Sequence, residues 1–285
     1  MIISDSFSDY RLLDTGDGMK LEYWNGYTLA RPDPQVIWPK QDPDAWAKAD
    51  AVYTRSSSGG GSWEFMRELP ERWTVSYRNL SFYVRPTGFK HTGLFPEQSA
   101  NWDFFDSIIK RSGRRVRVLN LFAYTGGATL ACAAAGAEVV HVDAAKSMVS
   151  WAKENAGLSG LQDRPVRYLV DDCLKFVLRE QRRGNTYDGI IMDPPSYGRG
   201  ADGKVFKLEN DIFGLIEEAA KLLSSDPLFF VLNSYTTGLS SAVCSNMLRI
   251  VLGDSGDIES GDLCIPVESG GIYLPCGTTT RWKTI

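Results

Sequence analysis

The sequence predicts an α/β fold, with an open and mostly parallel sheet covered by helices, and a small β-rich domain before it. Two observations carry this prediction. From about Arg117 onward, short apolar runs alternate with stretches of helical pattern, the order that is typical of parallel sheets. The stretch before it is rich in Trp, Tyr, Pro and Gly and contains short alternating runs instead.

The N-terminal stretch contains two predicted hairpins. Residues 20–24 and 27–31 flank Asn25-Gly26, a pair that accepts the positive φ of a tight turn. Residues 73–77 and 80–84 form a second pair around Arg78-Asn79. We therefore predict a β-rich substrate-recognition module over residues 1–88 and a second domain over 89–285. Residues 56–62, Ser-Ser-Ser-Gly-Gly-Gly-Ser, are expected to be a mobile loop, because no Gly-Lys-Ser/Thr follows that would bind phosphate.

The second domain is expected to alternate between the two element types along its length. Gly136 and Gly157 are predicted helix stops. Strands are predicted at 117–122, 138–142, 166–170, 187–192 and 228–233, with two short ones at 262–267 and 272–274, and helices at 128–135, 146–155, 173–183, 208–223 and 240–252.

Composition excludes several classes of protein. The chain has 285 residues and a net charge of −4, and no apolar run reaches the length of a membrane span. Its first residues lack the pattern of a signal peptide, and five scattered cysteines and two histidines suit neither a disulfide framework nor a metal centre. We expect a cytoplasmic protein without metal. The acidic balance weighs against strong nucleic-acid binding, and the basic clusters at 110–117 and 179–183 are either local patches or solvated helix ends.

The first predicted strand of the second domain ends in a glycine turn. Phe122 and Ala123 lead into Thr125-Gly126-Gly127, which opens a helix. Glycine there allows a ligand to approach the backbone, and helix N–H groups can face a carboxylate. The turn lacks the GxGxxG of nicotinamide enzymes. By itself this pattern is also compatible with ordinary turn chemistry.

Acidic residues follow the next two strands. Asp143 comes about twenty residues after the glycine turn, where a carboxylate can bind both hydroxyls of a ribose; the alternative is an N-cap of the following helix. Asp171-Asp172 ends the third strand. Because Cys173 opens the next helix, we expect Asp172 to accept a hydrogen bond from an adenine amine. Asp171 is then expected to be a plain N-cap.

The fourth strand ends in Asp193-Pro194-Pro195-Ser196-Tyr197. Two prolines cannot continue a strand, so they stop it and form a stiff, extended shelf. The shelf has an acid at one end and an aromatic ring at the other, and a flat ring such as a nucleobase fits on it. The alternative is a simple strand terminator.

These motifs resemble the class I S-adenosylmethionine-dependent methyltransferases, and more closely the bacterial large-subunit ribosomal RNA group that includes cytosine-C5 and guanine-N7 enzymes. The similarity covers roughly residues 88–282 and rests on residues 120–137, 142–146, 172–173 and 193–197. It implies a Rossmann-like, seven-stranded domain whose last strand is antiparallel, S-adenosyl-L-methionine as cofactor and S-adenosyl-L-homocysteine as product. It also implies that Phe95 and Gln98, in a segment similar to the family's K-T-G-F-F-x-D-Q, line the cofactor pocket.

The motifs and the resemblance together give two sets of candidate residues. In related aminomethyltransferases the acid and a backbone carbonyl of the proline motif hold an amine, and the aromatic ring stacks on the base. The candidate catalytic residues are Asp193, Pro194, Pro195 and Tyr197, and the candidate cofactor contacts are Phe95, Gln98, Asn120, Phe122, Ala123, Thr125, Gly126, Gly127, Asp143, Ala144, Asp172, Cys173 and Asp193.

One departure from the family pattern concerns the acceptor. The C5 enzymes use a nucleophilic cysteine after the fifth strand, where this chain has Thr236, and a hydroxyl without a base is a far poorer nucleophile. Cys244 is expected to pack inside a helix. The sequence therefore favours methylation of a ribosomal RNA base without a cysteine adduct. A small-molecule or protein substrate, or a non-catalytic cofactor-binding protein, are the alternatives.

Five tryptophans of the N-terminal stretch are candidates for base stacking, and the alternative is that most of them form a small core. They are Trp24, Trp38, Trp46, Trp63 and Trp73.

Overall fold

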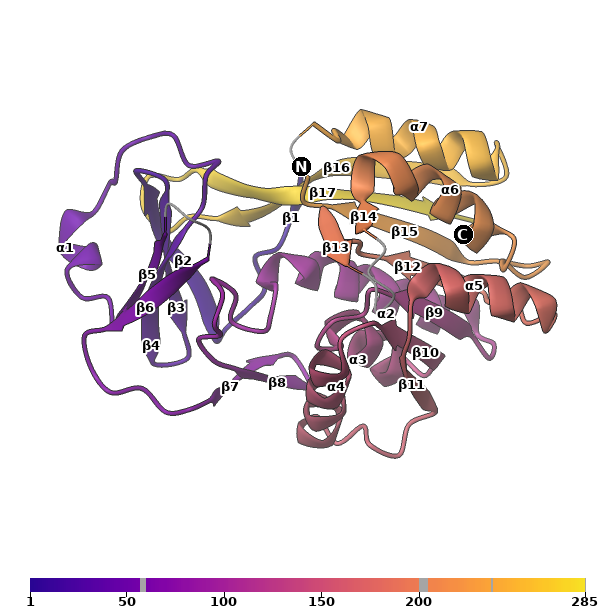
Figure 1. The fold of residues 1–285 in the computed structure, drawn as a ribbon, viewed down its shortest axis with the longest axis horizontal. Helices are drawn as coiled ribbons and strands as arrows, with labels where there is room; N and C mark the ends of the chain where they lie inside the picture. The colour runs from indigo at the N-terminus through magenta and orange to yellow at the C-terminus, as the bar shows by residue number, and fades with distance from the viewer. Residues whose placement is uncertain (57–59, 200–204, 237, 285) are drawn as a thin grey trace. The chain divides into compact units, whose positions relative to one another are not determined.

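The computed structural model describes residues 1–56, 60–199, 205–236 and 238–284 (Figure 1). Ser57, Ser58 and Gly59 of the predicted mobile loop lie outside the described residues. The chain divides into two compact units. The first comprises residues 3–99 and 264–276, and the second comprises 1–2, 100–263 and 277–285. The first unit thus continues past residue 88 to Ser99 and also takes a segment from near the C-terminus.

The first unit is built on a five-stranded sheet of order β2-β3-β4-β5-β6 with a separate two-stranded hairpin, β7-β8. Both predicted hairpins are confirmed. In the first, Asn25 (φ 44°) and Gly26 (φ 98°) form the tight turn that their residue types predict. The strands are β2 (Tyr10–Gly16), β3 (Met19–Trp24), β4 (Tyr27–Pro32), β5 (Ala51–Arg55), β6 (Gly61–Phe65), β7 (Trp73–Tyr77) and β8 (Leu80–Val84), and the short helices are α1 (Pro43–Trp46) and η1 (Pro96–Gln98).

The five tryptophans divide between core and surface. Trp24 and Trp73 are buried, and the Trp73 indole donates to the Trp24 carbonyl oxygen at 2.8 Å. Trp38, Trp46 and Trp63 are partly exposed. The packed-core interpretation therefore holds for Trp24 and Trp73, and the other three retain accessible surface.

The second unit contains the predicted parallel sheet. Its strand order is β1-β16-β17-β15-β12-β9-β10-β11, and β17 runs antiparallel to β15. The seven predicted strands are present, and the two-residue β1 joins them at the sheet edge. The bounds are β1 (Ile2–Ile3), β9 (Arg117–Leu121), β10 (Glu138–Asp143), β11 (Val166–Val170), β12 (Gly189–Met192), β15 (Phe229–Ser234), β16 (Asp257–Pro266) and β17 (Tyr273–Lys283).

Helices cover both faces of this sheet (Figure 1). Phe229 of β15 stacks on Phe105 of α2, whereas its neighbour Phe230 belongs to the core formed with α6 and α7. Since successive strand residues point to opposite faces, α2 lies on one face and α6 and α7 on the other. The helices are α2 (Ser99–Ser112), α3 (Gly127–Ala134), α4 (Lys146–Leu158), α5 (Cys173–Arg182), α6 (Leu208–Ala220) and α7 (Ser241–Leu252). In the part of the chain that the structure describes, no helix is long and apolar enough to cross a membrane.

Several predicted element bounds differ from the structure. Gly157 lies inside α4, which continues to Leu158 and is followed by Gly160 in the left-handed region (φ 67°). The two terminal strands are long, because polar residues extend them. Thr279 is fully buried in β17 and bonds to Asn101, and Thr280 bonds to Ser260 of β16. Threonine favours strands but breaks the apolar pattern from which the short strands were predicted.

Phe229 anchors α2 to the sheet, and its replacement by alanine tests that packing. The side chain is fully buried, and its ring lies against the β12 backbone, where a Cβ on Gly189 would come within 2.3 Å of it. We expect Phe229→Ala to lower the free energy of unfolding by about 3–5 kcal/mol. Ile250→Ala, at a site that is 72% exposed, should change it by less than about 0.5 kcal/mol. Urea denaturation measures both, and equal effects would contradict this packing.

Candidate functional site

The glycine turn between β9 and α3 has an unusual backbone. Phe122 (φ 57°) and Tyr124 (φ 48°) both lie in the left-handed region, and Gly126 follows at φ 90°. Non-glycine residues in that region carry strain, which structures tolerate mostly at functional sites. Surrounding bonds hold the turn, because Ala123 donates to the Val142 carbonyl and the Asn155 amide donates to the Thr125 carbonyl.

Gly127 is needed where α3 begins. A Cβ at this position would lie 2.7 Å from Cζ2 of the Trp102 ring, closer than atoms can pack. Gly126 has little more room, since a Cβ there would lie 3.0 Å from the Cβ of Ala152. Glycine is therefore required at both positions by the close packing of Trp102 and Ala152, and the first N–H groups of α3 begin at this turn.

Asp143 connects the ends of two neighbouring strands. It is the last residue of β10, and its Oδ2 accepts the Tyr124 N–H while its Oδ1 accepts the Ala145 N–H, each at 2.8 Å. The N-cap of α4 is Ala145, so the alternative role of Asp143 as that cap is not realised. Burial raises the pKa of the Asp143 carboxyl, and the two backbone hydrogen bonds oppose this rise.

Of the adjacent acids Asp171 and Asp172, the one that caps the next helix is not the one predicted. Asp172, not Asp171, is the N-cap of α5, and its side chain accepts the Lys175 N–H at 2.9 Å. Asp171 instead forms an ion pair with Arg179 and accepts the Asp172 N–H. The prediction of Asp171 as the cap is therefore wrong, because Asp172 precedes the first helical residue and its side chain reaches the free N–H. A contact of Asp172 with adenine remains a prediction, and the Asp172 cap leaves one carboxylate oxygen for it.

Two candidate cofactor contacts are buried and bonded within the protein. The Asn120 amide donates to Thr129 Oγ1, whose hydroxyl also meets His141 Nδ1, so Asn120 ties β9 to α3 and β10. The Cys173 thiol accepts the Phe122 N–H at 3.4 Å, and burial raises the pKa of that thiol well above its ordinary value. Both side chains are engaged in bonds within the protein, at the base of α3 and at Phe122. Their contact with a cofactor stays a prediction. Ala144 lies between Asp143 and the cap residue Ala145.

The proline motif, residues 193–197, follows β12 and so lies at the same carboxyl end of the parallel strands as Asp143. Asp193 follows β12, and its N–H donates to the Leu121 carbonyl of β9 at 3.4 Å. Pro194 is buried, Pro195 is exposed, and the Tyr197 side chain is 52% exposed. Tyr197 begins β13 (Tyr197–Arg199), which pairs with β14 (Val205–Lys207); residues 200–204 between them lie outside the described residues.

An aromatic contact links the proline motif to the glycine turn. Phe206 of β14 packs on Phe122 with ring centroids 5.8 Å apart. The strand ends explain the proximity, because β12 and β10 both pair with β9 in parallel and their carboxyl ends meet at one edge. The structure thus brings together the glycine turn, Asp143 and the proline motif, as the sequence predicts.

The sequence does not predict one contact between hydroxyls in this region. Thr236, which follows β15, donates to Ser196 Oγ at 2.6 Å. A threonine nucleophile would need a base, and the Thr236 hydroxyl donates instead to another hydroxyl. The signal was present in part, because Thr236 occupies the position of the family's cysteine and Ser196 belongs to the proline motif.

Three further residues are singled out in the sequence. Phe95 precedes η1 and Gln98 ends it, and both belong to the first unit, so their contact with the cofactor stays a prediction. Cys244 is buried within α7, which confirms the expected packing role.

The basic clusters expected to be patches or helix ends are largely paired. Lys110, in the last turn of α2, pairs with Asp106, and Arg115 pairs with Glu138. In the second cluster, Arg179 pairs with Asp171 and Arg183 with Glu180.

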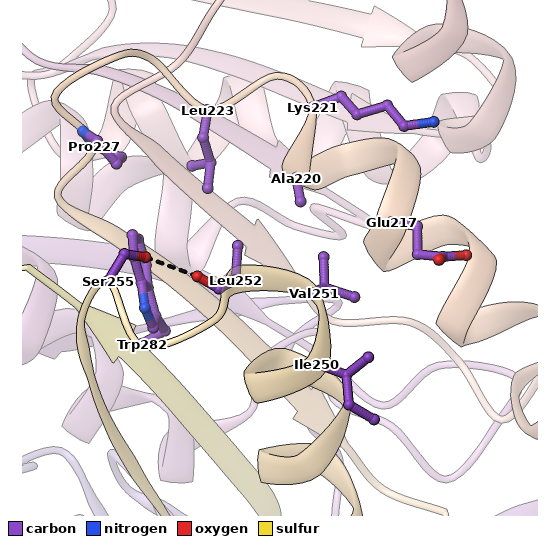
Figure 2. Close-up of a pocket in the computed structure, with 10 residues that line it drawn as sticks. All are labelled: Glu217, Ala220, Lys221, Leu223, Pro227, Ile250, Val251, Leu252, Ser255 and Trp282. Carbon is purple, nitrogen blue, oxygen red and sulfur yellow. Dashed lines mark hydrogen bonds between the residues drawn. The ribbon is translucent and has the colours of Figure 1, made fainter.

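A groove of about 520 Å³ lies at the end of the sheet where β15 begins, opposite the carboxyl ends of the parallel strands (Figure 2). Pro227 precedes β15, and the remaining walls come from the last turns of α6 and α7, with Trp282 at the sheet. The Ser255 hydroxyl closes one side by donating to the Leu252 carbonyl. Ligands of open α/β sheets bind at the carboxyl ends of the strands, so we do not assign the cofactor to this groove.

Comparisons with known proteins identify the family. The sequence profile of the S-adenosylmethionine-dependent methyltransferases matches residues 51–239, and the chain belongs to this family. A crystal structure of the SAM-dependent methyltransferase from Agrobacterium tumefaciens is similar over the whole chain, with 38% identity, 94% of that chain covered and a TM-score of 0.94.

Curated relatives are ribosomal RNA methyltransferases. The ribosomal RNA large subunit methyltransferase K/L of Shewanella baltica is 32% identical over 53% of this chain, and the match covers 20% of that relative's length. The ribosomal RNA large subunit methyltransferase K of Neisseria meningitidis is 25% identical over 77% of this chain and is covered to 64%. The chain therefore spans about a fifth of the length of the K/L relatives that it matches.

S-adenosyl-L-methionine is accordingly the cofactor of this protein. The described residues fit it. The N–H groups at the start of α3 suit a carboxylate, and the Asp143 carboxylate is fixed at the end of β10, where a ribose is held in such folds.

Asp143→Ala tests the cofactor site. Loss of the carboxylate should remove hydrogen bonds to the ribose and loosen the turn, so we expect the affinity for S-adenosylhomocysteine to fall about 10- to 100-fold. Isothermal titration calorimetry measures it, with Asp163→Ala in the exposed loop before β11 as the matched control. Because burial raises the pKa of Asp143, the affinity of the wild type should also decline at acid pH, starting above the ordinary pKa of an aspartate. Unchanged affinity in Asp143→Ala would contradict this site.

Proposed function

We propose that this chain methylates a nitrogen of a base in ribosomal RNA, without a covalent adduct between enzyme and base. The observation that carries the proposal is the proline motif beside the cofactor turn, with Thr236 bonded to Ser196 where a nucleophilic cysteine would be needed. An RNA substrate agrees with the cytoplasmic location that the sequence predicts.

The residues of the proline motif would position the acceptor. When bound, S-adenosylmethionine supplies a methyl group on a reactive sulfonium sulfur. The Asp193 carboxylate and the Pro194 carbonyl would accept N–H donors from the acceptor amine, which directs the nitrogen lone pair along the remaining direction. Tyr197, exposed at the start of β13, would stack on the base. Catalysis by this arrangement is mainly alignment, which can supply several kcal/mol of barrier reduction.

The cysteines support a route without a thiolate. Attack on C6 of a pyrimidine needs a thiolate, and burial raises the pKa of Cys132, Cys173, Cys244 and Cys276. Cys173 is additionally occupied by the Phe122 N–H, and Cys244 packs in the core. A nitrogen acceptor requires none of these thiols.

The choice of RNA is supported by the curated relatives, whose names describe ribosomal RNA methyltransferases. The net charge of −4 favours the second candidate, a small molecule or a protein side chain as acceptor. Salt separates the two, since binding to a polyanion weakens steeply with salt.

Transfer of a tritiated methyl group tests the proposal. The wild type and Asp193→Ala would be incubated with labelled S-adenosylmethionine and, separately, undermodified total RNA, protein and metabolites. We expect label in RNA and a loss of about 100-fold in Asp193→Ala, because the acceptor amine is no longer aligned. The matched control Asp163→Ala should behave as wild type.

The other outcomes are equally informative. Label in protein or metabolites alone would contradict the RNA proposal and support the second candidate. Cofactor binding without label in any fraction would indicate a non-catalytic protein. Nuclease digestion of labelled RNA identifies the methylated atom, and a C5-methyl product would contradict the nitrogen acceptor.

A further inference from the structure

The edge strand of the sheet in the first unit carries exposed aromatic side chains. β6 is the last strand in the order β2-β3-β4-β5-β6 and pairs antiparallel with β5. Directly opposed residues share a face, and the pairs here are Ala51 with Phe65, Tyr53 with Trp63 and Arg55 with Gly61. One face of this two-stranded edge therefore carries the buried Ala51 and Tyr53 and, at its border, Arg55, Trp63 and Phe65.

The aromatic rings of this face are ordered by their neighbours. The Trp63 ring stacks on Phe65 with centroids 6.4 Å apart and an interplanar angle of 26°, and Tyr53 meets it edge-on at 5.4 Å. The Trp63 indole donates to the Thr87 carbonyl at 2.8 Å, which fixes the ring. Phe65 remains 51% exposed, and Phe89, two residues after Thr87, is 68% exposed. The buried Tyr53 thus belongs to the core, and the ordered rings of Trp63 and Phe65 at its border leave aromatic surface exposed, as binding sites do.

Cations accompany the aromatic row. Among the residues that the structure describes, neither Arg55 nor Lys90 lies within ion-pair distance of a carboxylate, although the charge of Asp33 acts on Lys90. Lys90 follows Phe89, and its carbonyl accepts the Arg31 guanidinium at 2.8 Å, which places this segment beside the same sheet. Burial lowers the pKa of Lys90 to about 8, the cations Lys20, Arg55 and Arg31 lower it further, and the Asp33 carboxylate opposes the shift.

The nearby acids are already neutralised. Glu22 accepts two hydrogen bonds from Arg31, at 2.6 and 2.7 Å, and a third from Tyr10. Lys20 lies 3.7 Å from Glu22 and 3.6 Å from Asp33. His91, beside Lys90, has a pKa lowered to about 4 by burial and by the neighbouring cations, and is therefore neutral at pH 7. Arg55 and Lys90 are the cations of this surface for which the described residues provide no ion pair.

We propose that this face, defined by Arg55, Trp63, Phe65, Phe89 and Lys90, binds single-stranded RNA, with bases stacked on the exposed rings and phosphates at the two cations. This inference rests on the proposed function, because it assigns the substrate strand to a surface of the first unit. Single-stranded nucleic acid alternates π-faces with negative charges, and the row of rings beside unpaired cations matches both. A duplex hides its base faces and matches only the cations.

The test is the binding of a short fluorescein-labelled oligoadenylate, followed by fluorescence anisotropy. We expect the wild type to bind the single strand more tightly than the same strand annealed to oligouridylate. Phe65→Ala should weaken single-strand binding about tenfold through loss of one stacked base, and Phe65→Leu should weaken it similarly if stacking rather than apolar area is responsible. Arg55→Gln and Lys90→Gln should each flatten the dependence of log Kd on log salt by about 0.7.

The matched control is Lys48→Gln. Lys48 is exposed and follows α1, whose Ala45 and Trp46 pack with Val52, a residue on the opposite face of β5 from Arg55. It should bind RNA as wild type does. All variants should keep wild-type affinity for S-adenosylhomocysteine, which excludes unfolding as the cause.

The outcomes separate this inference from the proposed function. If the wild type methylates RNA but the Phe65, Arg55 and Lys90 variants bind the oligonucleotide as wild type does, the surface is overturned and the proposed function stands. If the wild type neither binds nor methylates RNA, both are overturned. Binding of an acidic peptide, but not of oligoadenylate, that is lost in the same variants would assign the surface to a protein partner and overturn the inference.

Discussion

The Asp143 carboxylate is the interaction on which the arrangement of the site depends. One of its oxygens holds the strained turn after β9 and the other holds the backbone before α4, so a single side chain fixes the two loops that we expect to face the cofactor. Such a contact is possible because β9 and β10 are parallel neighbours in register, and their carboxyl ends therefore meet. Left-handed backbone at Phe122 and Tyr124 is stable only with such support.

The acceptor side is coupled to this turn by packing. Phe122 contacts Phe206, which belongs to the hairpin that begins at Tyr197, and Asp193 is hydrogen-bonded to the end of β9. A change in the turn would therefore be transmitted to the residues proposed to hold the acceptor. This coupling is useful for a methyltransferase, because the donor carbon and the acceptor nitrogen must be aligned closely for transfer.

The pattern of apolar runs in the sequence was sufficient to predict most of the residues at the carboxyl ends of the strands. Each motif directly follows an apolar run, so the ends of four strands and the residues after them could be placed from the sequence alone. The exceptions depend on tertiary contacts. The terminal strands are longer than their apolar pattern because buried threonines are bonded by Asn101 and Ser260. The bond from Thr236 to Ser196 likewise joins loops that are forty residues apart. The cap of α5 needs no such contact, since Asp172 directly precedes the first helical residue, Cys173.

The central claim is that the cofactor lies at the carboxyl edge of the sheet, held by the glycine turn and Asp143. A crystal structure with S-adenosylhomocysteine bound tests it most directly. The account predicts ribose hydroxyls on the Asp143 carboxylate, the ligand's own carboxylate at the N-terminus of α3 and the adenine beside Asp172. A ligand bound in the groove between α6 and α7, or a ribose held without Asp143, would contradict it.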